Sequence, residues 1–182
     1  MRYPLHLLDE LDPDRRAHSL RVWRSIDTRY VPPPDRHQVR LAALLHDIGY
    51  AHPQTGFHPI DGAAWLHQAG YSPLVCHLVA THTAAHLEAA ERGLDPQIFT
   101  PYQLDDDTRT HRAALLAADL TSSPTGRPCT VAQRLAEISS RYPTGHPVAR
   151  YITRWGTELE NAATHHDQPT PVLDHPHSRP AC

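Results

Sequence analysis

An adjacent histidine and aspartate, His46 and Asp47, end an apolar segment and are followed by Ile48 and Gly49. Imidazole nitrogen and carboxylate oxygen are both good ligands for divalent metals such as Fe, Mn, Co, Ni and Zn. Where a helix ends, the backbone leaves regular geometry, and adjacent side chains can turn toward one point. An isolated pair of this kind is more often an ordinary helix terminus, with the histidine favoured by the helix dipole. The doublet alone is therefore weak evidence of a metal site.

Further candidate ligands occur on other segments that have helical periodicity: His18, His58, His82 and Asp119. Asp119 lies in the apolar run 113–120, where an ionised carboxylate is costly unless a cation or several donors compensate it. For His82 alone, a core histidine satisfied by hydrogen bonds is the ordinary interpretation, and His58 could simply cap a helix. Five or six metal-type ligands on separate helices, each at an inward position, nevertheless predict a metal site.

The segments that carry these residues have the apolar spacing of helices, and no segment alternates as a strand would. Asp12 and Pro13 begin the first helix, which we expect to run to Tyr30 and to end at the prolines 32–34. Further helices are expected at 35–48, 58–70, 72–93, 108–120, 131–142 and 148–163. The sequence therefore predicts an all-α bundle of about six to seven helices.

The composition is that of one small domain followed by a polar end. The 182 residues are 40% hydrophobic and 20% charged with a net charge of −3, so general attraction to nucleic acid or to an anionic membrane is not expected. Residues 1–165 are predicted to form the domain, and the Pro- and His-rich segment 166–182 a disordered tail. No apolar run could span a bilayer, and no signal peptide or cysteine framework is recognisable. We therefore expect a cytoplasmic protein.

The order His, His-Asp, His, His, Asp resembles the HD superfamily of metal-dependent phosphohydrolases. The motifs that carry the resemblance are Arg15-x-x-His18, the doublet in LLHDIG, His58 in HPIDGA, His82-Thr83, and Asp119 in LLAADL. Together they cover roughly residues 12–122. They are most similar to small bacterial HD proteins with extra histidines between the doublet and the final aspartate. The resemblance implies an HD-type helical bundle.

The resemblance also implies two divalent metal ions, drawn from Fe, Mn, Co, Ni and Zn. The residues expected to hold the first ion are His18, His46, Asp47 and Asp119. Asp47 would also reach a second ion, held by His58 and His82. A water between the ions would attack the phosphorus of a small phosphate ester, with nucleotides among the candidate substrates. The substrate, the native metal and the oligomeric state are not set by the sequence.

Three residues are predicted to act in catalysis: Asp47, Arg15 and His86. Arg15, or Arg16 beside it, could clamp phosphate with its guanidinium fork, although most surface arginines have no such role. His86 follows His82 by about one helical turn and could orient the substrate or its leaving group. A solvated helix face is the more ordinary interpretation of His86.

Tyr50 departs from the family pattern HD-x-x-K, in which a lysine three residues after the aspartate faces phosphate. A tyrosine brings no charge, so Arg15, Arg16, Arg40 or Arg127 could take the place of that lysine. A few HD proteins with mixed-valence di-iron sites are oxygenases that cleave C–C or C–P bonds, and they share the histidine-rich ligand set. A di-iron oxygenase is therefore the alternative enzyme. The alternative of another class is a metal-bound regulatory module without turnover.

Overall fold

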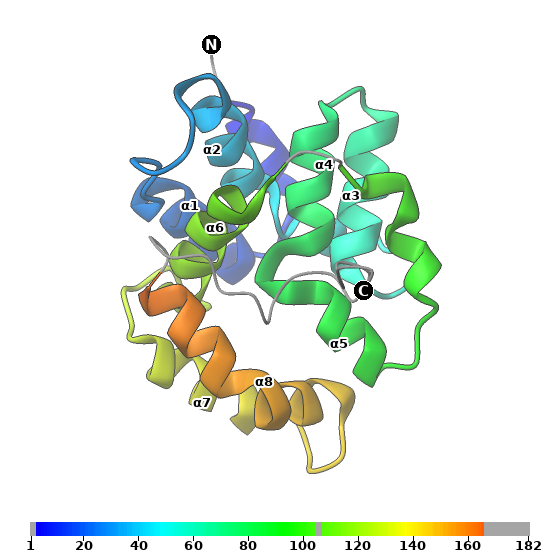
Figure 1. Ribbon diagram of the computed structural model, residues 1–182, viewed down its shortest axis with the longest axis vertical. Coiled ribbons are helices and arrows are strands. Elements are labelled where there is room, and N and C mark those ends of the chain that lie inside the picture. Colours follow the sequence, from blue (N-terminus) through cyan, green and yellow to red (C-terminus); the bar gives the residue numbers. More distant parts are fainter. Residues whose placement is uncertain (1–2, 105–106, 166–182) are drawn as a thin grey trace, which may run out of the picture.

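The computed structural model describes residues 3–104 and 107–165, where helices are joined by short loops into a bundle (Figure 1). The α-helices are α1 (Pro13–Ser25), α2 (Arg36–Leu45), α3 (His58–Gln68), α4 (Pro73–Thr81), α5 (Ala85–Glu91), α6 (Arg109–Leu120), α7 (Val131–Ser140) and α8 (Pro147–Thr164). Short 3-10 helices are η1 (Leu5–Glu10), η2 (Pro33–Asp35), η3 (Ile48–Tyr50), η4 (His82–Ala84) and η5 (Pro96–Tyr102). The described residues hold no strand, so the all-α prediction is confirmed. The predicted tail, 166–182, lies outside the described residues.

Three helices begin where the sequence predicts, because a polar side chain satisfies the free backbone N–H groups of the first turn. Asp12 accepts hydrogen bonds from the backbone N–H groups of Asp14 and Arg15 at the start of α1. Ser72 caps α4 in the same way. Thr130 caps α7, and the side chain of Gln133 reaches back to the Thr130 backbone to complete a capping box.

The first helix is shorter than predicted: it ends at Ser25, not at Tyr30. Ile26 takes an extended backbone conformation after the last helical residue. The Asp27 carboxylate then accepts a hydrogen bond from the Arg29 backbone N–H at 2.9 Å. Such a local side-chain bond offers the backbone an alternative to the helical one. The chain therefore leaves the helix before it reaches the prolines.

The predicted helix 72–93 is in fact two helices, α4 and α5, separated by η4. Thr83 and Ala84 both have left-handed backbone conformations, with φ of 48° and 51°. Each such residue costs on the order of 1 kcal/mol when it is not glycine. Neither a glycine nor a proline marks this break, which is why the sequence pattern did not show it. The break turns His82 out of the regular α4 helix and places it at the first position of η4.

The second helix also ends earlier than predicted, at Leu45 instead of Ile48. His46 and Asp47 follow it in the turn that leads into η3. The His46 ring hydrogen-bonds through Nδ1 to the carbonyl of Ala43 at 2.9 Å. The doublet therefore lies where the helix ends: His46 keeps helical dihedral angles and Asp47 departs from them.

Two apolar clusters hold the bundle together, and α6 contributes to both. Leu115 of α6 belongs to the larger cluster, which is formed mainly by α1 to α4. Leu116 and Leu120 face the smaller one, formed with α7 and α8. In Figure 1, α7 and α8 lie below the other helices, and α8 packs on both α5 and α6. The α7–α8 pair thus covers one side of the site described below.

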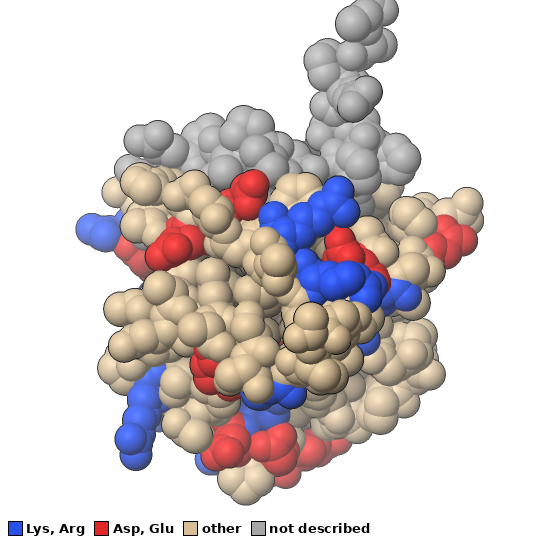
Figure 2. Space-filling view, turned by 90° about the horizontal axis from the view of Figure 1, so that it is seen from below, with Lys and Arg blue, Asp and Glu red and all other residues tan. Residues whose placement is uncertain are grey.

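None of the helices in the described part of the chain is long and apolar enough to cross a membrane. Figure 2 shows the molecule from below, the side on which α7 and α8 lie. Basic and acidic side chains lie next to one another over this side instead of forming a field of one sign.

Candidate metal centre

The six candidate ligands come from five elements and converge on one region. His18 lies in α1, His46 and Asp47 follow α2, His58 opens α3, His82 opens η4, and Asp119 lies in the last turn of α6. Five of them are buried, and His58 is partly exposed. Asp47 is only 3% exposed and Asp119 only 7%. Six polar side chains therefore meet in one largely buried region of the bundle.

The first donor group consists of His18, His46 and Asp47, whose ligand atoms lie within 4.8 Å of one another. The Nε2 atoms of His18 and His46 are 3.3 Å apart, and His46 Nε2 lies 3.7 Å from Asp47 Oδ1. Asp119 joins this group through Oδ1, which is 3.0 Å from His18 Nε2 and 4.0 Å from His46 Nε2.

The second donor group consists of Asp47, His58 and His82. The Nε2 atoms of His58 and His82 are 3.2 Å apart. His58 Nε2 lies 3.5 Å from Asp47 Oδ1, the same oxygen that faces His46. Asp47 is therefore common to both groups.

Backbone carbonyls fix the orientation of three imidazole rings. Nδ1 of His18 lies 3.0 Å from Ser123 O, and Nδ1 of His46 lies 2.9 Å from Ala43 O. His82 bonds to Val79 O in the same way, at 2.6 Å. A neutral ring that donates Nδ1–H to a carbonyl keeps its Nε2 lone pair free to bind a metal. The three lone pairs then point into the cluster.

The charges of the cluster suit a cation. Burial lowers the pKa of His46 and, more strongly, that of His58, which favours their neutral, metal-binding forms. Burial alone would raise the pKa of Asp47, but His46 and Arg15 hold it well below its usual range. Against burial, the hydrogen bond with His18 and the electrostatic interaction with His46 hold the pKa of Asp119 well below its usual range too. Two buried carboxylates thus stay ionised among donor nitrogens, and a buried charge of this kind needs a partner.

Tyr50, which stands where the family pattern has lysine, forms a stack with two neighbours. The Arg15 guanidinium lies over the Tyr50 ring, 3.7 Å from its centroid, and His58 stacks on Tyr50 with centroids 4.1 Å apart. Arg15 also donates to Asp47 Oδ2 at 2.9 Å. Tyr50 therefore brings no charge to the site, but it holds the cation and the imidazole that flank Asp47.

The arginines considered as replacements for the lysine differ in position. Arg15 lines the cavity beside the donor groups. Arg16 pairs with Asp9 at the surface, and neither Arg40 nor Arg127 is among the residues that line this cavity. Of the arginines proposed from the sequence, Arg15 is thus the one that the fold brings to the site.

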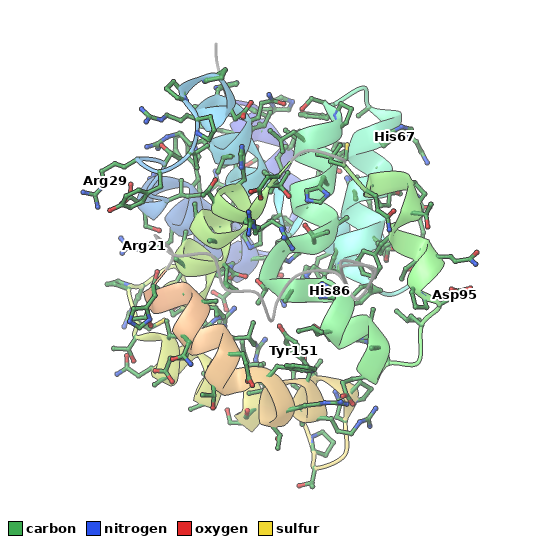
Figure 3. The ribbon with its side chains drawn as sticks, in the orientation of Figure 1. Arg21, Arg29, His67, His86, Asp95 and Tyr151 are labelled. Atoms are coloured by element: carbon green, nitrogen blue, oxygen red, sulfur yellow. The ribbon has the colours of Figure 1, made fainter. Side chains whose placement is uncertain are left out.

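His86 is not brought to the cavity. It is buried on α5 (Figure 3), so a solvated helix face, the more ordinary interpretation of this residue, is wrong. In one continuous helix His86 would lie on the same face as His82, four residues earlier, so the break at η4 separates the two side chains. The His86 neighbours Ala85 and Glu88 line the cavity instead.

Several residues of the site were missed by the sequence reasoning. Thr83 donates from Oγ1 to Asp119 Oδ2 at 2.5 Å, and the Tyr151 hydroxyl donates to the Thr83 carbonyl. Figure 3 shows Tyr151 on α8, and it reaches the segment between α4 and α5. Arg134 and Arg141 line the cavity from α7 and the residue after it. Arg134 had a signal, because it occupies an inward position in the apolar pattern of α7; Thr83 and Tyr151 had none.

Comparison with known proteins places this site in a family. A family model for the HD domain matches residues 15–120, which is more than half of the chain. An uncharacterized protein of Methanocaldococcus jannaschii is 25% identical over 130 residues, 70% of this chain and 73% of that protein. Two proteins named tRNA (cytidine(56)-2'-O)-methyltransferase, from Thermoplasma volcanium and Picrophilus torridus, are 33% and 31% identical over 47% and 48% of this chain.

The similarity covers only 26% of the length of each of those two methyltransferases. Most of each named protein therefore has no counterpart in the matched region. No solved structure matches. The HD domain match begins at Arg15 and ends at Leu120, and it contains all six candidate ligands. The chain belongs to the HD domain family.

Proposed function

We propose that this protein is a metal-dependent phosphohydrolase that cleaves a phosphate ester of a nucleotide or another small molecule. One observation carries the proposal: two donor groups share Asp47 at the base of a cavity that arginine side chains line. Adjacent metal ions with a shared carboxylate are the arrangement that in-line displacement at phosphorus uses. A cavity with cationic walls suits an anionic substrate.

The residues present fit two transition-metal ions. Imidazole and carboxylate ligands suit Fe, Mn, Co, Ni and Zn, and here they are buried, oriented by carbonyls and supplied in two groups. When bound, such ions lower the pKa of a water and offset the negative charge of phosphate. Without them, Asp47 would pair with Arg15, and Asp119 would pair with no arginine among the described residues.

The chain's own residues prepare the hydrolysis in three ways. Asp47 joins the two donor groups, Thr83 and His18 hold Asp119, and the stack of Arg15, Tyr50 and His58 closes one side. In the reaction, the oxygen of water forms a bond to phosphorus while the bond from phosphorus to the ester oxygen breaks. The leaving alcohol takes a proton that the water supplied, and inorganic phosphate remains.

A specific observation favours a second candidate, the di-iron oxygenase. Four histidines supply most of the donor set, and Tyr50 occupies the position at which hydrolytic relatives have lysine. The same geometry could hold iron in two oxidation states. Consumption of oxygen, not release of phosphate, would mark this activity.

The test is metal analysis after aerobic and anaerobic purification, followed by assays with nucleotides and phosphate esters. The proposal expects about two metal ions per chain and release of inorganic phosphate supported by several divalent ions. His58→Ala should lose part of the metal, whereas His67→Ala, an exposed histidine on the outer side of α3 (Figure 3), should lose none. Oxygen uptake by an iron-loaded protein would support the oxygenase. Bound metal without turnover of any substrate would support the regulatory module.

A further inference from the structure

The cavity has a wall that the family match does not include. The match ends at Leu120, whereas α7 and α8 lie after it and pack on α5 and α6. From this wall Arg134, Ile138, Arg141, Tyr142 and Ile152 line the same cavity as His18, Asp47 and Asp119. Residues of α7 and α8 therefore contribute to the cavity from outside the region that the family model matches.

Arg134 is a buried cation on this wall. It is only 6% exposed, although arginine is rarely buried unless it is paired. It donates from one terminal nitrogen to Glu137 at 2.6 Å, and its Nε is buried without a hydrogen-bond acceptor among the described residues. A buried donor left without an acceptor costs about 1–3 kcal/mol, so this group is an unusual feature of a folded protein.

Its partner does not neutralise the wall. Glu137 also pairs with Arg141, whose Nε lies 2.9 Å from the other carboxylate oxygen. One carboxylate thus serves two guanidinium groups, and the trio keeps one positive charge. Arg134 is also near enough to the donor groups for its charge to favour the ionised form of Asp119, in addition to the stronger effects of His18 and His46. Arg134 lines the same cavity as His18, Asp47 and Asp119.

The rest of this wall is apolar. Ile138, Val148 and Ile152 line the cavity beside the two arginines, and the ring of Tyr142 stands at the same wall. A phosphate held between the donor groups and Arg134 would have its ester group against this surface. A phosphodiester carries one negative charge and would have to place a second ester group there. A monoester carries two charges and has one ester group.

We propose that Arg134, supported by Arg141, binds the phosphoryl oxygens of the substrate, and that the substrate is a dianionic phosphate monoester with an apolar alcohol portion. The proposal rests on the proposed phosphohydrolase function and names the substrate class of the same site. Arg134 would contact the substrate directly, so it is a binding residue, and Glu137 offsets part of the positive charge of the two arginines. A hydrogen bond to a charged group contributes about 1.5–3 kcal/mol, which corresponds to about 10- to 100-fold in affinity.

The test measures binding of inorganic phosphate to the metal-loaded full chain by titration calorimetry, so that it does not depend on turnover. Arg134→Gln should weaken phosphate binding by at least about 10-fold with unchanged metal content, and Arg134→Lys should restore part of the loss. Arg154→Gln is the matched control, because Arg154 is exposed on α8 and pairs with Glu91. Dimethyl phosphate, a monoanion, should bind more weakly than phosphate and lose less in Arg134→Gln. Phosphate binding by Arg134→Gln within about twofold of the unmodified protein would overturn the proposal.

Glu137→Gln keeps the inference testable if Arg134→Gln fails to fold. Removing this carboxylate leaves Arg134 and Arg141 without their acidic partner, so phosphate should bind more tightly. Unchanged or weaker binding of phosphate would count against the proposal. The two proposals fail in different ways. If no ester is hydrolysed but phosphate binding depends on Arg134, the hydrolase function fails and the anion site stands. If esters are hydrolysed and phosphate binding is independent of Arg134, the anion site alone is refuted.

Discussion

Tyr151→Phe removes one hydroxyl and tests whether α8 holds the break between α4 and α5 in place. Tyr151 is 3% exposed, and its hydroxyl donates to the carbonyl of Thr83. Burial raises the pKa of Tyr151 well above its ordinary value, so the hydroxyl remains a donor at any pH of interest. Thr83 and Ala84 both have left-handed backbones. The bond from Tyr151 is thus one of the contacts that compensate a strained turn.

The expected loss follows from the carbonyl that the substitution leaves without its donor. An unsatisfied buried acceptor costs about 1–3 kcal/mol, and Phe fills nearly the same volume as Tyr, so little packing energy is lost. For a domain of this size, about 1 kcal/mol lowers the melting temperature by about 2–4 °C. We therefore expect Tyr151→Phe to lower the melting temperature of the metal-free protein by about 2–12 °C.

The same substitution should affect the second donor group more than the first, because His82 directly precedes the strained turn. Metal analysis should show that up to one metal ion per chain is lost. In a reconstitution assay, the metal concentration that gives half-maximal activity should rise. Tyr30→Phe is the control, since Tyr30 is 52% exposed and lies away from the turn in sequence. If Tyr151→Phe melts within 1 °C of the unmodified protein (roughly 0.3–0.5 kcal/mol) and keeps its full metal content, α8 does not support this turn and the reasoning fails.

Three further outcomes are expected. Asp47→Ala should lower turnover on an established substrate by at least about 100-fold and reduce metal content, while circular dichroism stays unchanged; near-full activity would place the catalytic centre elsewhere. Chelation should lower the melting temperature, because ligands that bind only the folded state stabilise it; an equal melting curve after verified metal removal would show that the donor groups bind no metal in the native protein. Gly49→Ala should destabilise by roughly 3 kcal/mol or more, whereas Gly156→Ala in the middle of α8 should stabilise by up to about 1 kcal/mol; similar unfolding free energies for the two variants would contradict the packing described below.

The convergence of the candidate ligands was predictable in part, because three of them break an apolar pattern. Asp119 stands among leucines and alanines, and the doublet interrupts an apolar segment at its end. A polar group in such a place needs compensation, and the family motifs provided the order of the others. The structure brings the six side chains together within a few ångströms, at the positions that the spacing indicated. Their role as metal ligands stays a prediction.

The residues around the candidate ligands are positioned by contacts between segments far apart in the sequence. The break at Thr83 has no glycine or proline, and it is held by Asp119 and Tyr151, which lie 36 and 68 residues away. The break also ends the regular helix in which His86 would share a face with His82. Arg134 lies on a helix after the motifs, so only the packing of α7 on the bundle reveals that it faces the ligands. Local pattern cannot show any of these contacts.

The glycines of the two motifs LLHDIG and HPIDGA explain how the second donor group meets the first. A Cβ atom on Gly49 would lie 2.0 Å from the His58 carbonyl oxygen and 2.6 Å from the Gly62 backbone nitrogen. A Cβ atom on Gly62 would in turn lie 3.0 Å from the Gly49 nitrogen. The turn after α2 and the first turns of α3 therefore touch backbone to backbone.

This close approach determines the position of His58 relative to Asp47. His58 is the first residue of α3, and Asp47 is two residues before Gly49, so any separation of the two backbones would move the imidazole away from the carboxylate. The present distance, 3.5 Å from His58 Nε2 to Asp47 Oδ1, leaves little room for such a movement. At Gly156, by contrast, the nearest atoms to an added Cβ are 3.8 Å away, and a methyl group fits. The absence of a side chain at Gly49 thus lets one carboxylate belong to both donor groups.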